Sequence, residues 1–393
     1  MSQDLRATYA ERWPFYDEDE IEAVVELLRS GRVNQWTGNT VATFERSCEK
    51  HFGGGKGIAL ANGSVALELA LRAFGIGPGD EVIVSPRSFV ASASCVRLVG
   101  ATPIFADVDP NSGNITAETI EAVVTDRTKA VIPVHLAGWP CDMPAIVLLA
   151  AQHNFLVIED CAQAHGAAIA GRPVGSFGDA AAFSFCQDKI ISTGGEGGYV
   201  SFKDEEAWEF AWSFKDHGKN REKVGLPADG AHFRWLHDSV GTNWRLTAPQ
   251  AALGIAQLEK LARWIEARSA NAEIIAKAVG GVSGIETPKP SPAMKHSYYK
   301  YYFYLTDAAL VSRDDILESA RVEGIRLFSG SCSEIYRELA FDDLPMPSCP
   351  VAERLGRASL MMEVHPTLSP ELLKLRAERV AEIADGKMRQ QSS

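Results

Sequence analysis

The sequence predicts an α/β protein in which a large, mostly parallel sheet domain precedes a smaller C-terminal α+β domain. Up to about residue 250, short runs that are apolar throughout alternate with helical stretches, a pattern typical of strands covered on both faces. A long helical pattern at 246–279 follows, and the region after it differs in character. Because 393 residues exceed one ordinary hydrophobic core, we expect two domains, 1–250 with an N-terminal arm and 251–393.

The predicted strands of the first region are short and mainly apolar. A helix is expected at 63–75, directly after the first strand, and another at 143–153. This alternation favours parallel strands whose carboxyl ends meet on one edge of the sheet, where α/β proteins bind ligands. We expect strands at 57–62, 81–86, 102–109, 129–136, 155–160 and 180–185.

The second region combines a strand with helices. Residues 296–305, HSYYKYYFYL, alternate like a strand, and helices are expected at 312–324 and 369–384. The aromatic residues of that strand are more typical of sheet and core packing than of a sugar-binding surface. Between the two regions, 216–243 is long and irregular, which is typical of functional or disordered loops.

The composition, with 46% hydrophobic and 23% charged residues, is that of a soluble globular protein. A formal net charge of −12 argues against nucleic acid and membrane surfaces as partners, and no apolar run is long enough to span a bilayer. The first ten residues lack the features of a signal peptide. Seven cysteines, an odd number without a C-x-x-C pair, argue against a disulfide framework or a zinc site. We therefore expect a cytoplasmic protein without a metal centre.

Lys189 stands between a strand-like run and a glycine-rich segment, in FSFCQDKIISTGGEGGYV at 183–200, where little around it offers a charge partner. A buried ammonium is costly unless it is paired or loses its proton, and a lysine in that state is a good imine-forming nucleophile. Taken alone, Lys189 is more simply an exposed loop lysine. Other residues at the strand ends decide between the two interpretations.

Two further sites lie at the strand ends. Asp160 ends the predicted strand 155–160, where it suits a protonated ring nitrogen, although an acid at that position can also cap the next helix. Gly63 and Ser64 begin a predicted helix whose free N–H groups and dipole suit a phosphate, although they could equally form an ordinary helix cap. Ser184 lies near Lys189 in the sequence and offers a hydroxyl to the same phosphate.

Together these residues provide a phosphate site, a partner for a pyridinium and an imine-forming amine, which are the duties of a protein that binds pyridoxal 5'-phosphate (PLP). No G-x-x-x-x-G-K-[ST] sequence is present, so Asp160 is not convincing as the acid of an ATPase. The segment GGEGG at 194–198 does not match G-x-G-x-x-G, so a dinucleotide site has little support.

Four segments, taken together, resemble the DegT/DnrJ/EryC1/StrS family of PLP-dependent sugar aminotransferases. They are NGSVALELAL (62–71), VIEDCAQAHGA (157–167), the FSF run with its lysine and GGEGG (183–198), and TNWRLTAPQAALGIAQL (242–258). The resemblance runs from about residue 31 to residue 369. It implies the fold-type-I architecture of PLP-dependent transferases and a homodimer with shared active sites.

The resemblance also implies a role for each residue of the cofactor site. Lys189 would hold PLP covalently and then transfer a proton, while Asp160 would pair with the pyridine nitrogen. Gln163 would contact the phenolic oxygen of the cofactor, and Phe89 would stack on its ring. The phosphate would be bound by residues of one chain and one residue of a neighbouring subunit: Gly63, Ser64, Val65, Ser184 and, across the interface, Asn243.

Two departures from the family pattern concern the substrate. Where S-F-H-P-x-K is common, this chain has SFCQDK at 184–189, with Cys186 in place of the histidine. Relatives that act on inososes or make aminohydroxybenzoate also lack that histidine, usually with glutamine instead. The segment 326–338 replaces an aromatic-rich H-Y segment of many relatives. Candidate substrate contacts are His217, Arg245 and His296, although His217 is equally an exposed loop histidine and Arg245 equally an interface residue.

We expect an aminotransferase that moves an amino group from an amino acid, with L-glutamate as the expected donor, to a keto group of a nucleotide-linked sugar. Lys189 and Asp160 are its expected catalytic residues. Cys186 keeps open a cyclitol or aminohydroxybenzoate-type enzyme of the same family. A PLP sugar dehydratase is disfavoured because those relatives replace the lysine with histidine. A PLP-binding regulatory protein without turnover is the alternative that is not an enzyme.

Overall fold

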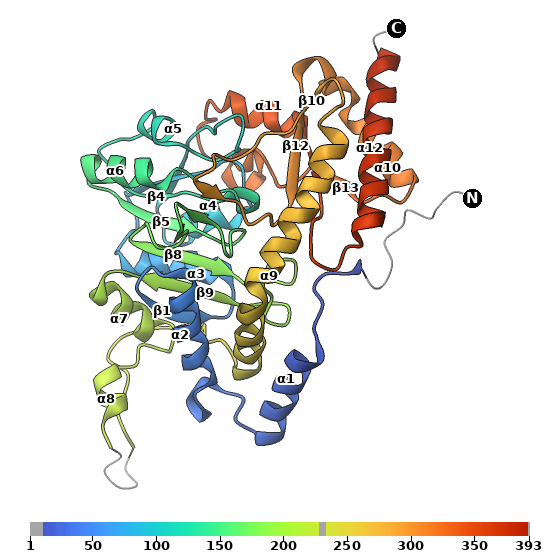
Figure 1. Cartoon of the computed structure of the whole chain (residues 1–393). Coiled ribbons are helices and arrows are strands. Elements are labelled where there is room, and N and C mark those ends of the chain that lie inside the picture. Colours follow the sequence, from blue (N-terminus) through green and yellow to red (C-terminus); the bar gives the residue numbers. More distant parts are fainter. Residues whose placement is uncertain (1–10, 228–232, 392–393) are drawn as a thin grey trace.

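The structure is a computed structural model that describes residues 11–227 and 233–391. Its centre is a seven-stranded sheet, which lies in the blue and green part of Figure 1. Most residues of these short strands are buried, because both faces of the sheet are covered. In spatial order the strands are β1 (Lys56–Leu60), β9 (Gly198–Phe202), β8 (Ala180–Ser184), β5 (Leu156–Asp160), β4 (Thr128–Ile132), β2 (Glu81–Val84) and β3 (Thr102–Phe105).

Six of these seven strands run in the same direction, so the prediction of a mostly parallel sheet is confirmed. The exception is β9, which pairs antiparallel with both β1 and β8. The strands predicted from the sequence do not include this one. The carboxyl ends of β1, β5 and β8 therefore meet on one edge of the sheet, which positions the candidate site described below.

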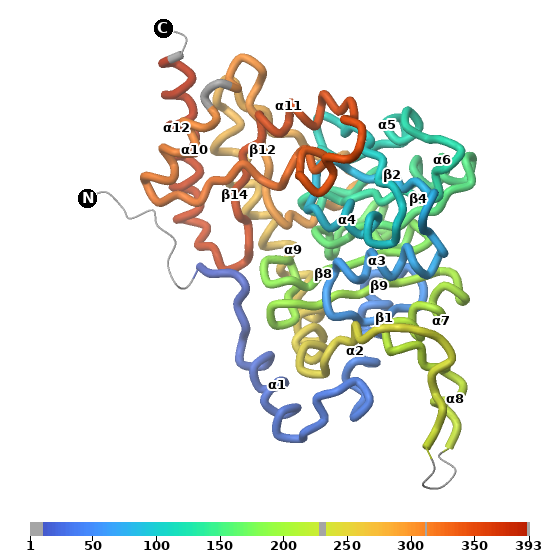
Figure 2. The backbone as a smooth tube through the Cα atoms, turned by 180° about the vertical axis from the view of Figure 1, so that it is seen from behind, coloured from blue at the N-terminus to red at the C-terminus, as the bar shows by residue number. Residues whose placement is uncertain are grey.

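Helices cover both faces of this sheet, as Figures 1 and 2 show from opposite sides. They are α2 (Thr40–Phe52), α3 (Gly63–Ala73), α4 (Ala91–Leu98), α5 (Ala117–Glu121), α6 (Met143–His153), α7 (Glu205–Phe214) and α9 (Ala248–Val279). On one face, α2 and the first half of α9 pack together with Phe183 and Tyr199 of the sheet. On the other face, α3 and α7 contact β1 and β9.

The 32-residue helix α9 links the large sheet to a second hydrophobic core. It begins with a capping box formed by Thr247 and Gln250 and has a proline in its first turn, both common at helix starts. Its Leu258 packs with the large sheet, whereas Ile275 packs in the C-terminal core. The domain boundary expected near residue 250 stays a prediction, because this one helix contributes to both cores.

The C-terminal part is built on a four-stranded antiparallel sheet. Helices α10 (Arg313–Val322) and α12 (Pro370–Gln391) contribute to its core, and α12 also lies along α9 (Figure 1). The strands of this sheet are β10 (Ile285–Glu286), β12 (Tyr301–Leu305), β14 (Ser359–Met362) and β13 (Leu327–Phe328). Smaller elements nearby are α11 (Pro350–Ala358) and the three short strands β11 (Met294–Lys295), β6 (Ala168–Ile169) and β7 (Arg172–Pro173).

Several expected strands are shorter in the structure: those expected at 102–109 and 129–136 end at Phe105 and Ile132, and the one expected at 296–305 differs most. The sequence predicts a strand over 296–305, but β12 begins only at Tyr301. Tyr298 has a φ of 48°, a left-handed conformation that does not continue a strand. The Tyr298 N–H donates to the His296 Nδ1 (2.8 Å) and so is taken by a local contact. The prediction for 296–300 is therefore wrong.

The irregular segment 216–243 contains one short helix, α8 (Arg221–Gly225), and its residues 228–232 lie outside the described part. In both Figure 1 and Figure 2, α8 projects from the body of the molecule beyond α7. Phe233 and Trp235 are strongly exposed on this segment, at 76% and 82%. Large exposed aromatic residues of this kind are typical of a contact surface.

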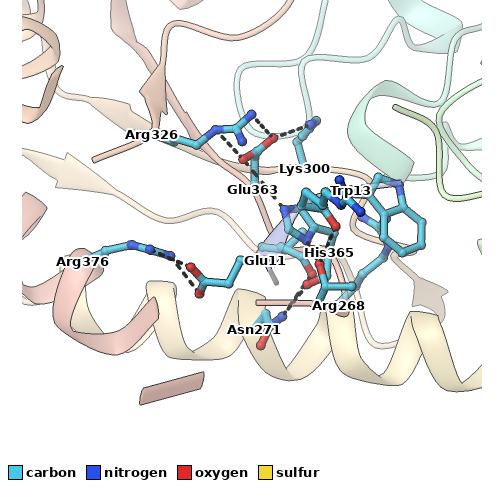
Figure 3. Close-up of polar contacts among 12 residues, drawn as sticks. Glu11, Trp13, Arg268, Asn271, Lys300, Arg326, Glu363, His365 and Arg376 are labelled. Carbon is cyan, nitrogen blue, oxygen red and sulfur yellow. Dashed lines mark hydrogen bonds and ion pairs between the residues drawn. The ribbon is translucent and has the colours of Figure 1, made fainter. Parts of the chain in front are cut away.

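The N-terminal arm, residues 11–17, precedes α1 (Glu18–Ser30) and connects the two parts of the molecule; Figure 3 shows its polar contacts. Glu11 forms a buried ion pair with Arg376 of α12, with 2.8 Å between Nη2 and Oε2. The Trp13 ring lies edge-on to Trp264 and 5.0 Å from the Arg268 guanidinium. Within the described residues, every helix is too short or too polar to cross a lipid bilayer.

Candidate active site

A cavity of about 680 Å³ opens at the edge of the large sheet where β5 and β8 end. Its walls include the start of α3, the start of α4 and the loop that follows β8. Strand ends and helix N-termini converge at this edge, which suits a phosphorylated ligand. Of the residues predicted for cofactor binding and catalysis, the lining contains Gly63, Ser64, Val65, Phe89, Asp160, Gln163, Ser184 and Lys189.

Lys189 lies in a tight loop that the glycine-rich segment 194–198 holds in place. The Lys189 N–H donates to the Cys186 carbonyl (3.0 Å), and the Gln187 N–H donates to the Gly195 carbonyl (2.9 Å). Gly195 has a φ of 116°, which residues with a side chain rarely adopt. The loop places Lys189 at the cavity wall with 14% of its side chain exposed.

Three contacts position Lys189. Its carbonyl oxygen accepts a hydrogen bond from the Trp13 Nε1–H (2.8 Å). Its Nζ lies 3.9 Å from the Asp188 Oδ1 and 4.9 Å from the centre of the Tyr299 ring. Lys189 was expected to have little around it that offers a charge partner, but the adjacent Asp188 directs its carboxylate to the same amine.

Asp160, the last residue of β5, is buried and forms no ion pair with any described residue. Its Oδ2 accepts a hydrogen bond from the Ser92 hydroxyl (2.7 Å), and its Oδ1 accepts one from the Ala162 N–H (3.1 Å). Burial raises the pKa of Asp160, although these two hydrogen bonds and the charge of Lys189 act in the opposite direction. A cation bound in the cavity would offset this cost, so a protonated ring nitrogen fits the site.

Gln163 and Phe89 both present groups that a flat ligand could use. The Gln163 Oε1 accepts a hydrogen bond from the Ala137 N–H (2.7 Å), which leaves the amide nitrogen as the end available to a ligand. Phe89 lines the same cavity with 65% of its surface exposed. A ring that exposed has a free face, which fits stacking on an aromatic ligand.

The start of α3 offers fewer free N–H groups than expected. Asn62 caps this helix, and its Oδ1 accepts the Val65 N–H (3.0 Å), so a phosphate would compete with the cap for that group. The Ser64 N–H has no hydrogen-bond partner among the described residues. Gly63 is required by a close approach, because a Cβ there would lie only 2.6 Å from the Ser184 Cβ. An anion at this point would meet the hydroxyls of both serines.

The structure does not bring Asn243, His217 or Arg245 into the lining of this cavity. All three lie within or just after the projecting segment, where Asn243 and His217 are exposed. Arg245 forms an ion pair with Asp216, a carboxylate that also pairs with Lys219. These three predicted site residues are therefore not brought together with Lys189 in this structure.

His296 also lies outside the cavity lining. It is buried, and its ring stacks on that of Tyr298 with the centroids 3.9 Å apart. Burial lowers the pKa of His296 to about 3, so the imidazole is neutral at physiological pH. His296 is therefore a packed core residue in this structure, and it does not contact the cavity that contains Lys189.

The sequence analysis missed several polar residues of the cavity. The hydroxyls of Ser88 and Ser92 lie 3.0 Å apart, and Ser92 in turn donates to Asp160. No helical spacing marks this pair, because Ser88 precedes α4 whereas Ser92 lies in its first turn. Glu196 and Tyr299 also line the cavity, but they come from segments whose approach to it depends on the tertiary fold.

An amine and a buried carboxylate in one cavity, beside the start of a helix, are the groups that a protein supplies to PLP. The fold and this site define a PLP-dependent aminotransferase. The chain belongs to the DegT/DnrJ/EryC1/StrS aminotransferase family, whose model matches residues 14–382.

Relatives of this chain share most of its length. The GDP-perosamine synthase of Caulobacter vibrioides is 36% identical over 362 residues, which are 91% of this chain and 93% of that protein. The 3-amino-5-hydroxybenzoate synthase of Amycolatopsis mediterranei is 34% identical over 337 residues, 85% of this chain and 84% of that protein. Among solved structures, the aminotransferase from Psychrobacter cryohalolentis is 45% identical, with a TM-score of 0.90 and coverage of 97% of this chain and 99% of that one.

These similarities confirm the expected fold class, the PLP cofactor and the enzyme class. The enzyme class argues against a regulatory protein without turnover, although the pleiotropic regulatory protein of Geobacillus stearothermophilus is also 33% identical over 363 residues, 91% of this chain and 92% of that protein.

Proposed function

We propose that this enzyme transfers an amino group from an amino acid, L-glutamate by preference, to the keto group of a nucleotide-linked sugar. The observation that carries the proposal is the presence of the Lys189 amine and the buried Asp160 carboxylate in one cavity. The similarity to a GDP-perosamine synthase over 91% of the chain supports the class of acceptor. An enzyme with this activity would take part in the biosynthesis of amino sugars and polysaccharides.

The cavity residues fit PLP, each through an observation given above. Lys189 would hold the cofactor covalently through its amine, and Asp160 would pair with the ring nitrogen. Gln163 would donate its free amide N–H to the phenolic oxygen, and Phe89 would cover the ring face. The residues that would surround the phosphate are Gly63, Ser64, Val65 and Ser184, with Asn243 of a second subunit.

When bound, PLP accepts the electron pair that remains when the Cα–H bond of the amino acid breaks. Asp160 supports this by holding the ring proton in place. Lys189, once its amine is released, takes the Cα proton at Nζ and later returns a proton to carbon. A base of this kind works best when it is neutral close to the working pH. The small exposed fraction of the Lys189 side chain, 14%, limits proton exchange with bulk water.

Cys186 favours a second candidate acceptor, a cyclitol or an aminohydroxybenzoate precursor. Its side chain lines the cavity, with Sγ 4.0 Å from the Glu196 Oε1, at the position where nucleotide-sugar relatives commonly carry histidine. The 34% identity to a 3-amino-5-hydroxybenzoate synthase supports this alternative. We place the nucleotide sugar first because the GDP-perosamine synthase matches more of both chains.

We also propose a homodimer in which each cavity is completed by the other subunit. The proposed substrates are anions, yet carboxylates outnumber cations in the described lining. Cationic groups for the substrates would therefore come from another surface, and Arg245 at the base of the projecting segment is the candidate. The charged lining residues are Glu68, Asp160, Asp188 and Glu196 against the single cation Lys189.

A half-reaction tests the activity without an acceptor. L-Glutamate added to the PLP-loaded enzyme should change the absorbance of the cofactor and release 2-oxoglutarate in equal amount. GDP- and UDP-linked keto-sugars compared with an inosose then identify the acceptor class. Turnover of the inosose together with no turnover of any nucleotide-linked sugar would reject the first candidate and favour the second.

Borohydride reduction of the loaded enzyme, followed by peptide mapping, tests the lysine. The cofactor should be found on the peptide that contains Lys189. The Lys189→Ala variant should still bind PLP, because the other contacts remain, but it should not transaminate. Full turnover by this variant would refute the assignment.

A further inference from the structure

We propose that Asp188 and Tyr299 form a positioning pair that holds the Lys189 amine and stabilises it when it carries a proton. This inference rests on the proposed function, in which Lys189 is the group that moves protons. Neither residue belongs to the cofactor contacts described above, and residue 188 is the variable position of the motif before the lysine.

The two residues approach the amine from different segments of the chain. Asp188 directs its Oδ1 to the Lys189 Nζ at 3.9 Å. Its other oxygen, Oδ2, accepts a hydrogen bond from the Tyr299 hydroxyl. The Tyr299 ring centre lies 4.9 Å from the same Nζ. All three residues line the cavity, so this arrangement borders the space that the substrate would occupy.

Tyr299 can hold Asp188 because Tyr299 is itself fixed. Its backbone N–H donates to the Ala137 carbonyl (2.8 Å), and its carbonyl accepts a hydrogen bond from the Arg268 Nη1 (3.1 Å). Burial, reinforced by Asp188, raises the pKa of Tyr299, so its hydroxyl keeps the proton that it donates. The carboxylate is therefore anchored at one oxygen while the other oxygen faces the amine.

The other charged and titratable groups nearby have partners of their own or lie across the cavity. The Lys300 Nζ lies 5.1 Å from the Tyr299 ring, but it pairs with Glu363 at 3.5 Å. Among the described residues, Asp188 is the carboxylate that forms an ion pair with Lys189. The other groups that face this arrangement are Arg268 and Tyr302 beside Tyr299, the buried His165 near Lys189 and, in the cavity lining, Asp160, Cys186 and Glu196.

The pair acts when Lys189 receives the proton. An N–H bond would form at the Lys189 Nζ as the Cα–H bond of the amino acid breaks, and bound PLP would supply the acceptor for the electron pair. The new ammonium lies in a cavity with limited access to water, where the Asp188 carboxylate stabilises it. Without Tyr299, this carboxylate could turn to solvent, since 51% of the Asp188 side chain is exposed.

Chemical labelling of Lys189 in the cofactor-free protein tests the pair without turnover. Acetic anhydride reacts with the uncharged amine, and mass spectrometry of the Lys189 peptide gives its rate at pH 7. Asp188→Asn should raise this rate by roughly three- to tenfold, the effect expected from losing one partly screened charge beside the amine. Asp188→Glu should return the rate toward that of the wild type, and Tyr299→Phe should give an intermediate rate.

The matched control is Glu196→Gln. Glu196 is a carboxylate of the same cavity that forms no ion pair with Lys189, so its removal should leave the labelling rate close to that of the wild type. In the loaded enzyme, Asp188→Asn should move the acidic limb of the kcat profile of the half-reaction to lower pH. An unchanged labelling rate in Asp188→Asn would overturn the proposal, and a wild-type rate in Tyr299→Phe would remove Tyr299 from it. Borohydride mapping tests Lys189 separately, so the two assignments can fail independently.

Discussion

Asp160 meets two opposing physical demands. It is buried at the end of β5, and burial raises its pKa, whereas its proposed role requires a charged carboxylate. The Ser92 hydroxyl and the Ala162 N–H both favour the charged form and fix its orientation. A bound ring cation would add a charge partner for the carboxylate. Burial of the charged Asp160 therefore costs free energy in the cofactor-free protein, and the cofactor would offset this cost.

The first prediction concerns catalysis by this residue. Asp160→Asn keeps the shape of the side chain but removes the charge opposite the ring nitrogen. The rate of the half-reaction with L-glutamate, followed by stopped-flow absorbance, should fall on the order of 10²-fold or more. Ser92→Ala, which removes one hydrogen bond and keeps the charge, should cause a much smaller loss. A wild-type rate in Asp160→Asn would show that the residue has another role.

The second prediction concerns the stability of the cofactor-free protein. Folding raises the pKa of Asp160 above its ordinary value of 3.8, so the folded state holds this proton more tightly than the unfolded state does. The contribution of this proton to the free energy of unfolding is present below pH 4 and is lost as the pH rises through the raised pKa of Asp160. The asparagine in Asp160→Asn does not titrate. The free energy of unfolding of this variant, measured with urea, should therefore increase relative to that of the wild type as the pH rises. A difference that stays constant between pH 4 and pH 8 would contradict this.

Some of the secondary-structure elements around the cavity can be predicted from the sequence, and others cannot. Strands β5 and β8 and the start of α3 follow from local patterns, because apolar runs and a cap signal are each confined to a few residues. Strand β9 does not, because its first residue, Gly198, is selected by a distant contact. A Cβ at Gly198 would lie 2.2 Å from the Asn62 carbonyl oxygen. In the same way, Asp188 and Tyr299 meet across 111 residues, which no local pattern reveals.

The third prediction tests the close approach of α3 to β8. Gly63→Ala would place a Cβ 2.6 Å from the Ser184 Cβ, so one of the two elements must move. We expect a loss of about 1–3 kcal/mol in the free energy of unfolding and weaker binding of PLP. Gly77→Ala is the control, since its Cβ would lie 3.6 Å from the nearest atom and should change stability by less than about 0.5 kcal/mol. Similar losses in both variants would argue against the steric explanation.

The fourth prediction concerns the N-terminal arm. Glu11→Gln removes the negative charge from the buried ion pair with Arg376. The free energy of unfolding should fall by roughly 3 kcal/mol. Glu22→Gln breaks the exposed pair with Arg29 and should cost less than about 1 kcal/mol. If both variants unfold at the same urea concentration, the arm is not anchored by this pair.

At the scale of the whole molecule, the described subunit has an acidic cavity at one edge and an exposed, partly aromatic projection at another. Asn243 and Arg245 lie at the base of that projection and do not line the cavity of their own chain. A two-fold dimer uses the same surfaces on both subunits, so one such contact would complete two cavities at once. We propose shared active sites because the cavity lies on one surface of the chain, whereas Asn243 and Arg245 lie on another.

The fifth prediction tests the sharing directly. Lys189→Ala and Asn243→Asp should each inactivate the enzyme, the second because a carboxylate repels the cofactor phosphate. After subunit exchange, a mixed dimer has one site with both changes and one site with neither. An equal mixture should therefore recover about one quarter of the wild-type activity, because half of the randomly paired dimers are mixed. No recovery, despite mixed dimers detected by differential tagging, would place Asn243 outside the partner's site.

The hydrogen bond from the Trp13 indole to the Lys189 carbonyl has a practical consequence. It places a natural fluorophore beside the residue on which the coloured cofactor is proposed to sit. Energy transfer should quench the emission of that indole when the cofactor is attached and restore it when the cofactor departs. The wild-type protein would then report its own loading in real time, with Trp13→Phe as the background trace.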